Sequence, residues 1–139
     1  MEKEFVPYEQ ALALKELDYK EKCLASFYTY DIENFKKNRY DYRGKFNIDY
    51  SSEDDYVINT DKSYYVATPT FSQAFRWFRE KYDLHENVGI KHFIEKTYCY
   101  SIVSTSIPHY IHDKSHFASY EEAELECLKK LIEIVKAKK

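Results

Sequence analysis

Apolar residues recur with helical spacing along the last segment of the chain, Ser119 to Lys139, and divide it into an apolar half and a polar half. The apolar half carries Ala123, Cys127, Leu128, Leu131, Ile134 and Val135, with Ile132 at its edge. The polar half carries Glu122, Glu126, Lys129, Lys130, Glu133 and Lys136. Ser119 and Glu122 have the spacing of a capping box, which satisfies free backbone N–H groups where a helix begins. The pattern therefore predicts one long amphipathic helix against which the preceding strands pack.

Two earlier segments predict further helices. Pro7 stands where helices often begin, and a short apolar face follows it. That face consists of Ala11, Ala13, Leu14 and Leu17. The second helix is expected to begin at Thr68 or Thr70, with Pro69 near its first turn. Its core stripe has helical spacing and consists of Phe71, Ala74, Phe75, Phe78 and Tyr82.

Short runs of high β-propensity lie between these helices. They are Cys23 to Tyr30, Tyr40 to Tyr50, Tyr56 to Ile58, Tyr64 to Ala67, Val88 to Ile94, Thr97 to Ser104 and Ile107 to His112. Gly44 either bends the second run as one long strand or turns a hairpin there. Connections this short require antiparallel pairing, because parallel neighbours need a crossover of about a dozen residues or more. We expect a single α+β domain over residues 1–139, an antiparallel sheet with about three helices packed mainly on one face.

Composition excludes several classes of protein. Gly44 and Gly89 are the only two glycines, so a glycine-rich phosphate loop is absent. The net charge of −3 argues against binding to duplex DNA, which normally requires a strongly basic domain. No signal peptide opens the chain and no apolar run has membrane-spanning length, so we expect a cytoplasmic protein with no membrane partner. The three cysteines are far apart and fit reduced thiols; they are Cys23, Cys99 and Cys127.

Three segments carry a resemblance to a known family. They are FVPYEQALALKEL (5–17), PTFSQAFRWFREKY (69–82) and YEEAELECLKKLIEIV (120–135). Together they resemble a family of small uncharacterised proteins found in phage and prophage genomes, over under half of the chain. After the first helix this chain has Asp18, Tyr19 and Lys20, where that family often has Gly and acidic residues. The resemblance implies the setting of a phage-type accessory protein and brings no residue roles with it.

Glu124 is the sharpest anomaly of the pattern, because it lies within the apolar stripe of the last helix. An unpaired charge at a buried position is expensive. One interpretation is an ion pair with an arginine of the second helix, Arg76 or Arg79, since buried carboxylates are normally paired. The alternative is a carboxylate that faces a ligand at the helix start.

A second candidate site interleaves aromatic rings with positive charges. It consists of Arg39, Tyr40, Tyr42, Arg43 and Lys45, helped by Arg76. Such a strand can stack a base and hold phosphate, or it can be an edge strand that its cations protect from aggregation. In a regular strand Arg43 and Lys45 face away from the tyrosines, so a shared site needs Gly44 to bulge, or two protomers of a homo-oligomer. Trp77 lies off the stripe of the second helix, where it either extends the core or anchors an interface.

The remaining reactive residues form no catalytic or metal-binding motif. His109, His112 and His116 do not have the spacing of a zinc site, and we expect no metal and no cofactor. The serines near residue 101 lack a nucleophile elbow, and Cys99 lacks a basic partner in sequence, so a small hydrolase is the least favoured class.

The lack of a catalytic motif favours a non-enzymatic binding protein, and the resemblance to phage and prophage proteins implies an accessory protein that antagonises a host defence. Two mechanisms compete. In the first, a pocket lined by tyrosine, arginine or lysine sequesters a nucleotide-derived signalling ligand. In the second, an aromatic-rich surface blocks a host protein.

Overall fold

The computed structural model describes residues 2–28, 46–48, 57–60, 65–106 and 110–138. Its contacts divide the chain into two compact units, residues 1–70 and residues 71–139, and each is described by itself. Both units combine helix with antiparallel strands, so the predicted α+β class is confirmed. The described strands form two three-stranded sheets, whereas a single sheet was expected.

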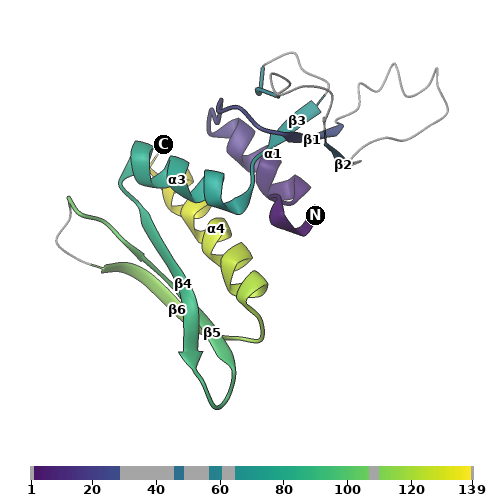
Figure 1. Cartoon of the computed structure of the whole chain (residues 1–139). Helices are drawn as coiled ribbons and strands as arrows, with labels where there is room; N and C mark the ends of the chain where they lie inside the picture. The colour runs from purple at the N-terminus through teal and green to yellow at the C-terminus, as the bar shows by residue number, and fades with distance from the viewer. Residues whose placement is uncertain (1, 29–45, 49–56, 61–64, 107–109, 139) are drawn as a thin grey trace. The chain divides into compact units, whose positions relative to one another are not determined.

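The first unit packs one helix against a small sheet (Figure 1). Its elements are the 3-10 turn η1 (Glu2–Glu4), helix α1 (Tyr8–Glu16), and strands β1 (Ala25–Tyr28), β2 (Phe46–Ile48) and β3 (Tyr65–Thr68). The strand order is β2-β1-β3, with both pairs antiparallel. Helix α1 begins directly after Pro7, as expected, and turns Ala11 and Leu14 into the core.

Buried polar side chains tie the loops of the first unit to its strands. Asn59 donates from Nδ2 to the carbonyl of Tyr19 and accepts from the backbone N–H of Ala67, both at 2.9 Å. Thr68 donates from its hydroxyl to the carbonyl of Val6 at 2.6 Å. Asn59 and Thr68 thereby have hydrogen-bond partners, which removes most of the cost of burying their polar groups.

The second unit places two helices against a three-stranded meander (Figure 1). Its elements are helix α3 (Phe71–Tyr82), strands β4 (His85–His92), β5 (Thr97–Val103) and β6 (Tyr110–Phe117), and helix α4 (Tyr120–Ala137). The strand order is β4-β5-β6, antiparallel throughout, and α4 contacts all three strands. Every connection is short, as antiparallel pairing allows.

Alternation along the strands provides the core under α4. Tyr100 and Ile102 of β5 are buried, as is Phe117 of β6, and they share this core with the apolar stripe of the helix. The buried residues of α4 are Ala123, Cys127, Leu128, Leu131, Ile132 and Val135. The helix begins as its capping box predicts: Ser119 Oγ accepts from the N–H of Glu122 at 3.1 Å, and Glu122 in turn accepts from the N–H of Ala118 at 3.2 Å.

Most predicted strands are recovered with shifted ends where the structure describes them. The predicted strand Tyr56–Ile58 is wrong in its described part, where Val57 forms only an isolated antiparallel bridge with Cys23. β4 begins three residues before the predicted Val88 and ends at His92, and β6 continues beyond the predicted His112 to Phe117. Of the Tyr40–Tyr50 run only Phe46–Ile48 is described, so the alternative of a bend or a hairpin at Gly44 lies outside the described residues. In the described part of the chain, no helix combines the length and apolar character needed to cross a bilayer.

Candidate functional site

A pocket with a volume of about 330 Å³ lies in the second unit, between α3, β4 and α4. Its lining residues are Ser72, Phe75, Arg79, Glu86, Asn87, Val88, Tyr120 and Glu124. We call it the carboxylate pocket, because Glu86 and Glu124 both reach it. Its volume is at the lower end of the range usual for ligand sites, which is roughly 300–1,000 Å³.

Helical and strand periodicity explain why these side chains converge. Arg79 follows Phe75 by four residues on α3, and Glu124 follows Tyr120 by four on α4, so each pair shares one face of its helix. Glu86 lies opposite Ile102 in the ladder, and Ile102 is fully buried; Glu86 therefore faces the side of the sheet that the helices cover.

One ion pair crosses the carboxylate pocket. Arg79 Nη1 lies 2.5 Å from Glu86 Oε1 and 3.1 Å from Glu86 Oε2. The Glu86 side chain is only 16% exposed and that of Arg79 is 36% exposed, so the pair is partly desolvated. Burial raises the pKa of Glu86 above its ordinary value, and the Arg79 guanidinium opposes that rise.

Among the described residues, Glu124 has no such counter-ion. Within the described residues it forms neither of the ion pairs that the sequence suggested, because Arg79 pairs with Glu86 and Arg76 is exposed on α3. The expected arginine pair is therefore corrected: β4 contributes a carboxylate that competes for Arg79. Burial, followed by repulsion from Glu121, raises the pKa of Glu124.

Tyr120 forms the aromatic wall of the pocket at the first turn of α4. Its side chain remains 42% exposed, and its ring meets that of Tyr98 edge to face at 6.4 Å. Burial raises the pKa of Tyr120, and the negative charges of Glu124 and Glu86 add to that rise. The phenol is thus neutral, with a hydroxyl beside two carboxylates.

The charges of the carboxylate pocket do not balance. Two carboxylates face one guanidinium, which is already paired with Glu86. Such a site disfavours an anion, because phosphate would meet Glu86 and Glu124 without a free cation. It suits a cationic group with hydrogen-bond donors, which would restore the balance at Glu124.

The other predicted site residues lie elsewhere. The segment containing Arg39, Tyr40, Tyr42, Arg43 and Lys45 falls outside the described residues. Trp77 is only 6% exposed and packs edge to face on Phe78 and Tyr82. Of its two interpretations, the structure agrees with extension of the core. Lys81 lies over the Trp77 ring at 5.1 Å.

The sequence analysis assigned no role in a site to four of the lining residues, Ser72, Glu86, Asn87 and Tyr120. For Glu86 a signal was present, since Glu86, Val88 and Ile90 alternate with polar or small residues. The strand was expected to begin at Val88, which left Glu86 in a loop. Tyr120 was expected only as part of the start of the last helix, because nothing in the sequence indicated that it lines a pocket.

A second polar cluster joins the start of β4 to the end of β5. Asp83, at a left-handed φ of 55°, accepts hydrogen bonds from the hydroxyls of Ser104, Thr105 and Ser106 at 2.6–2.8 Å. The ring of His85 also meets it at 2.7 Å. These bonds, first those from Ser106 and Thr105, hold the pKa of Asp83 well below its usual range. All three hydroxyls donate to the Asp83 carboxylate, so these hydrogen bonds activate none of them as a nucleophile.

Cysteines and histidines show no reactive arrangement in the described part of the chain. Cys23, Cys99 and Cys127 are free thiols, and burial raises the pKa of Cys23 to about 12. His112 is bonded to the Tyr100 hydroxyl at 3.1 Å, and His116 stacks on His92. No group of three or more metal-ligating side chains occurs among the residues described, and His109 lies outside them.

Comparisons of this chain with protein-family models, with curated proteins and with solved structures gave no match.

Proposed function

We propose that this protein is a non-enzymatic binding protein that blocks a partner protein, and that the carboxylate pocket receives a lysine or arginine side chain of that partner. The observation that carries the proposal is Glu124, a partly buried carboxylate for which the described residues provide no counter-ion, at a pocket that already contains one complete ion pair. A partly desolvated charge is stabilised when a binding partner provides the opposite charge.

The aromatic walls support the same kind of ligand. Tyr120 and Phe75 line the pocket beside the carboxylates. A lysine or arginine that enters can place its alkyl stem against these rings and its charged end at Glu124. Arginine and tyrosine are also the residue types most often found at the energetic centre of protein interfaces.

The setting belongs to the proposal as well. The resemblance of the three helical segments to phage and prophage proteins supports an accessory protein that antagonises a host defence. Blocking a host protein requires no catalytic group. The action would take place in the host cytoplasm.

Sequestration of a nucleotide-derived ligand is the competing mechanism, and it depends on the Arg39–Lys45 segment. The described pocket supports it poorly, since the two carboxylates would repel phosphate. The two mechanisms thus assign ligands of opposite charge to different parts of the chain, and a single kind of experiment separates them.

The test is a nuclear magnetic resonance titration of the isotope-labelled full chain. N-acetylarginine amide and N-acetyllysine amide are the probes, with N-acetylglutamine amide as the uncharged control and a mononucleotide as the anionic probe. We expect the two basic amides to shift resonances of residues 72–88 and 120–124, with dissociation constants on the order of millimolar.

Two results would contradict the proposal. One is a basic amide that shifts no pocket resonance more than the uncharged control does. The other is a mononucleotide that binds more tightly than the basic amides and shifts Arg43 and Lys45, which would favour the nucleotide mechanism.

A further inference from the structure

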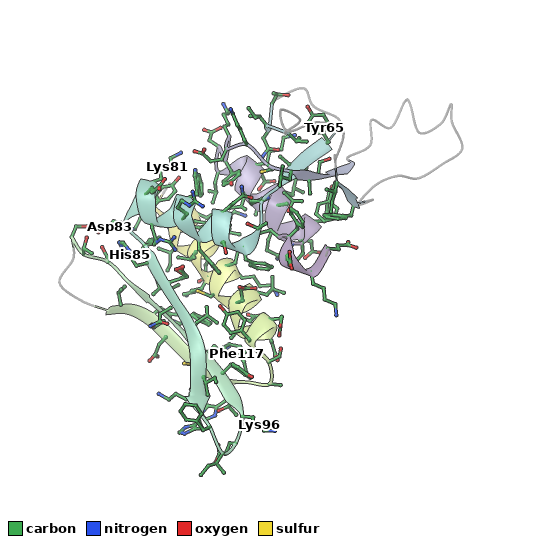
Figure 2. All side chains as sticks on the ribbon, in the orientation of Figure 1. Tyr65, Lys81, Asp83, His85, Lys96 and Phe117 are labelled. Carbon is green, nitrogen blue, oxygen red and sulfur yellow. The ribbon has the colours of Figure 1, made fainter. Side chains whose placement is uncertain are left out.

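The turn between β4 and β5 carries large apolar side chains that are almost fully exposed to solvent. Phe93 is 84% exposed and Ile94 is 96% exposed, and Ile90, just before the turn, is 52% exposed. Figure 2 shows Lys96 at the far end of this hairpin, beyond Phe117 and away from the helices of the unit. We call Ile90–Lys96 the hairpin tip. Isolated exposed apolar residues are common, but two large ones together at the end of a projecting turn are not.

Positive charge surrounds these apolar side chains. Lys91 and Lys96 flank them and are exposed, against the single carboxylate of Glu95. Lys114 pairs with Tyr100 in the middle of the ladder, and its ammonium lies 5.9 Å from the ring of Phe117, which pairs with Tyr98 nearer the tip. The rings of His92 and His116 stack beside the turn at 6.4 Å. The tip is thus locally basic in a protein of net charge −3.

The backbone of the hairpin is ordered by its own ladder. Pairing between β4 and β5 continues to His92 and Thr97, so only a four-residue turn, Phe93–Lys96, lies beyond the last pair. Lys96 adopts a φ of 52°, which closes the turn. The tip is therefore a preformed projection, and presenting Phe93 and Ile94 to a binding surface requires no refolding.

We propose that the hairpin tip docks on an anionic lipid bilayer, with Phe93 and Ile94 in the interfacial region and Lys91 and Lys96 at the headgroups. Basic residues beside apolar and aromatic ones are the composition of interfacial anchors. Two side chains expose on the order of 300–400 Å², whereas a stable protein interface buries about 800 Å² on each partner. A convex tip of that area fits a fluid bilayer better than a protein face.

The sequence predicted no membrane partner because it has no apolar run long enough to span a bilayer. Interfacial docking does not need such a run, since only side chains of the turn enter the boundary region. This inference does not depend on the carboxylate pocket, because the tip shares no residue with the lining of that pocket.

The experiment is co-sedimentation of the full chain with vesicles of phosphatidylcholine alone and with vesicles containing 30% phosphatidylserine, at low and at high salt. We expect binding to the anionic vesicles, little binding to the neutral ones, and weaker binding at high salt. Lys91→Gln with Lys96→Gln should weaken binding roughly 25-fold, about fivefold for each lysine. Phe93→Ser with Ile94→Ser should weaken it at least about tenfold.

The control replaces two exposed apolar residues outside the tip, Leu24→Ser with Val103→Ser, and should bind like the parent chain. A second measurement uses Phe93→Trp: its fluorescence should shift to the blue with anionic vesicles, against the background of the buried Trp77. Failure of the parent to sediment with anionic vesicles would overturn the proposal, as would tip variants that bind like the parent. Self-association of the parent that the tip variants abolish would also overturn it, since the tip would then contact a second copy.

Discussion

At the scale of single residues, Glu124 connects the stability of the protein to its proposed function. This carboxylate is partly buried and has no counter-ion in the part of the chain that the structure describes, so it destabilises the fold when it is ionised and is stabilised when a cation binds. Residues retained at the expense of stability are a common feature of binding sites. The same residue should therefore respond in opposite directions when stability and binding are measured.

Glu124→Gln is expected to raise the free energy of unfolding at pH 7 by a few tenths to about 1 kcal/mol, since solvent screens this partly exposed group. Burial raises the pKa of Glu124, so the folded state holds its proton more tightly than the unfolded state does. The cost of the carboxylate is therefore greatest above the folded pKa and disappears as the pH falls below the unfolded value of about 4.3. Urea titrations at pH 7 and pH 4 should show a gain at pH 7 only. A loss of stability at pH 7 would mean that Glu124 has a cation partner.

Asp83 has the opposite dependence on pH. Hydrogen bonds from Ser106, Thr105, His85 and Ser104 lower its pKa, so its contribution is fully present above the unfolded pKa of about 3.9 and is lost as the pH falls toward the folded value. Asp83→Asn keeps a residue that tolerates the left-handed φ of 55° but removes the charge. Its melting temperature should lie below that of the parent at pH 7, and the difference should narrow at pH 3. If the difference in melting temperature did not depend on pH, the geometry of the side chain rather than its charge would cause the loss of stability.

At the scale of elements, helix α4 organises the second unit. Its stripe was visible in the sequence because six buried positions recur at helical spacing, and its start was visible because Ser119 and Glu122 form a local motif. Such patterns involve residues that are close in sequence, so they can be recognised without knowledge of the tertiary structure. The pairing of Arg79 with Glu86 was not visible, because it depends on where the α3–β4 turn places a strand beside the helix.

Leu131→Ala tests the packing of α4 directly. Leu131 is fully buried, and removing its isobutyl group leaves a cavity in the core of the second unit. We expect a loss of about 2–5 kcal/mol in the free energy of unfolding. Lys129→Ala on the exposed face of the same helix is the control and should change it by less than about 0.5 kcal/mol. A loss for Leu131→Ala as small as that of the control would show that the stripe does not form the core.

At the scale of the whole molecule, the sequence predicted the α+β class correctly but did not predict how the strands are distributed between two sheets. Alternation and short connections determine antiparallel pairing, and both described sheets are antiparallel. They do not determine which strands share a sheet: β3 pairs with β1 across about forty residues, and Asn59 joins Tyr19 to Ala67 over a similar separation. Such long-range choices depend on competing packings that a single sequence does not display. The single-domain prediction stays a prediction beside the two compact units.

The candidate site was predicted in part for the same reason. Glu124 stood out because it interrupts an apolar stripe. Glu86 shows only the alternation of a strand and Tyr120 shows no local signal, and these two residues become neighbours only when β4 packs beside α4. The Arg39–Lys45 segment keeps its nucleotide hypothesis. Replacing Arg43 and Lys45 together by alanine, with calorimetry at two salt concentrations, tests whether this segment binds nucleotides.

The proposal that Glu124 binds a basic side chain is tested most directly by the affinity of Glu124→Gln for N-acetylarginine amide. This affinity is measured by nuclear magnetic resonance and compared with that of the parent chain. Glu133→Gln is the matched control, because it makes the same change of charge on the same helix at an exposed site that does not line the pocket. We expect Glu124→Gln to weaken binding about tenfold, or about 1.4 kcal/mol, and Glu133→Gln to leave the affinity unchanged. Equal affinities for all three proteins, or equal losses in both variants, would contradict the proposed role of Glu124.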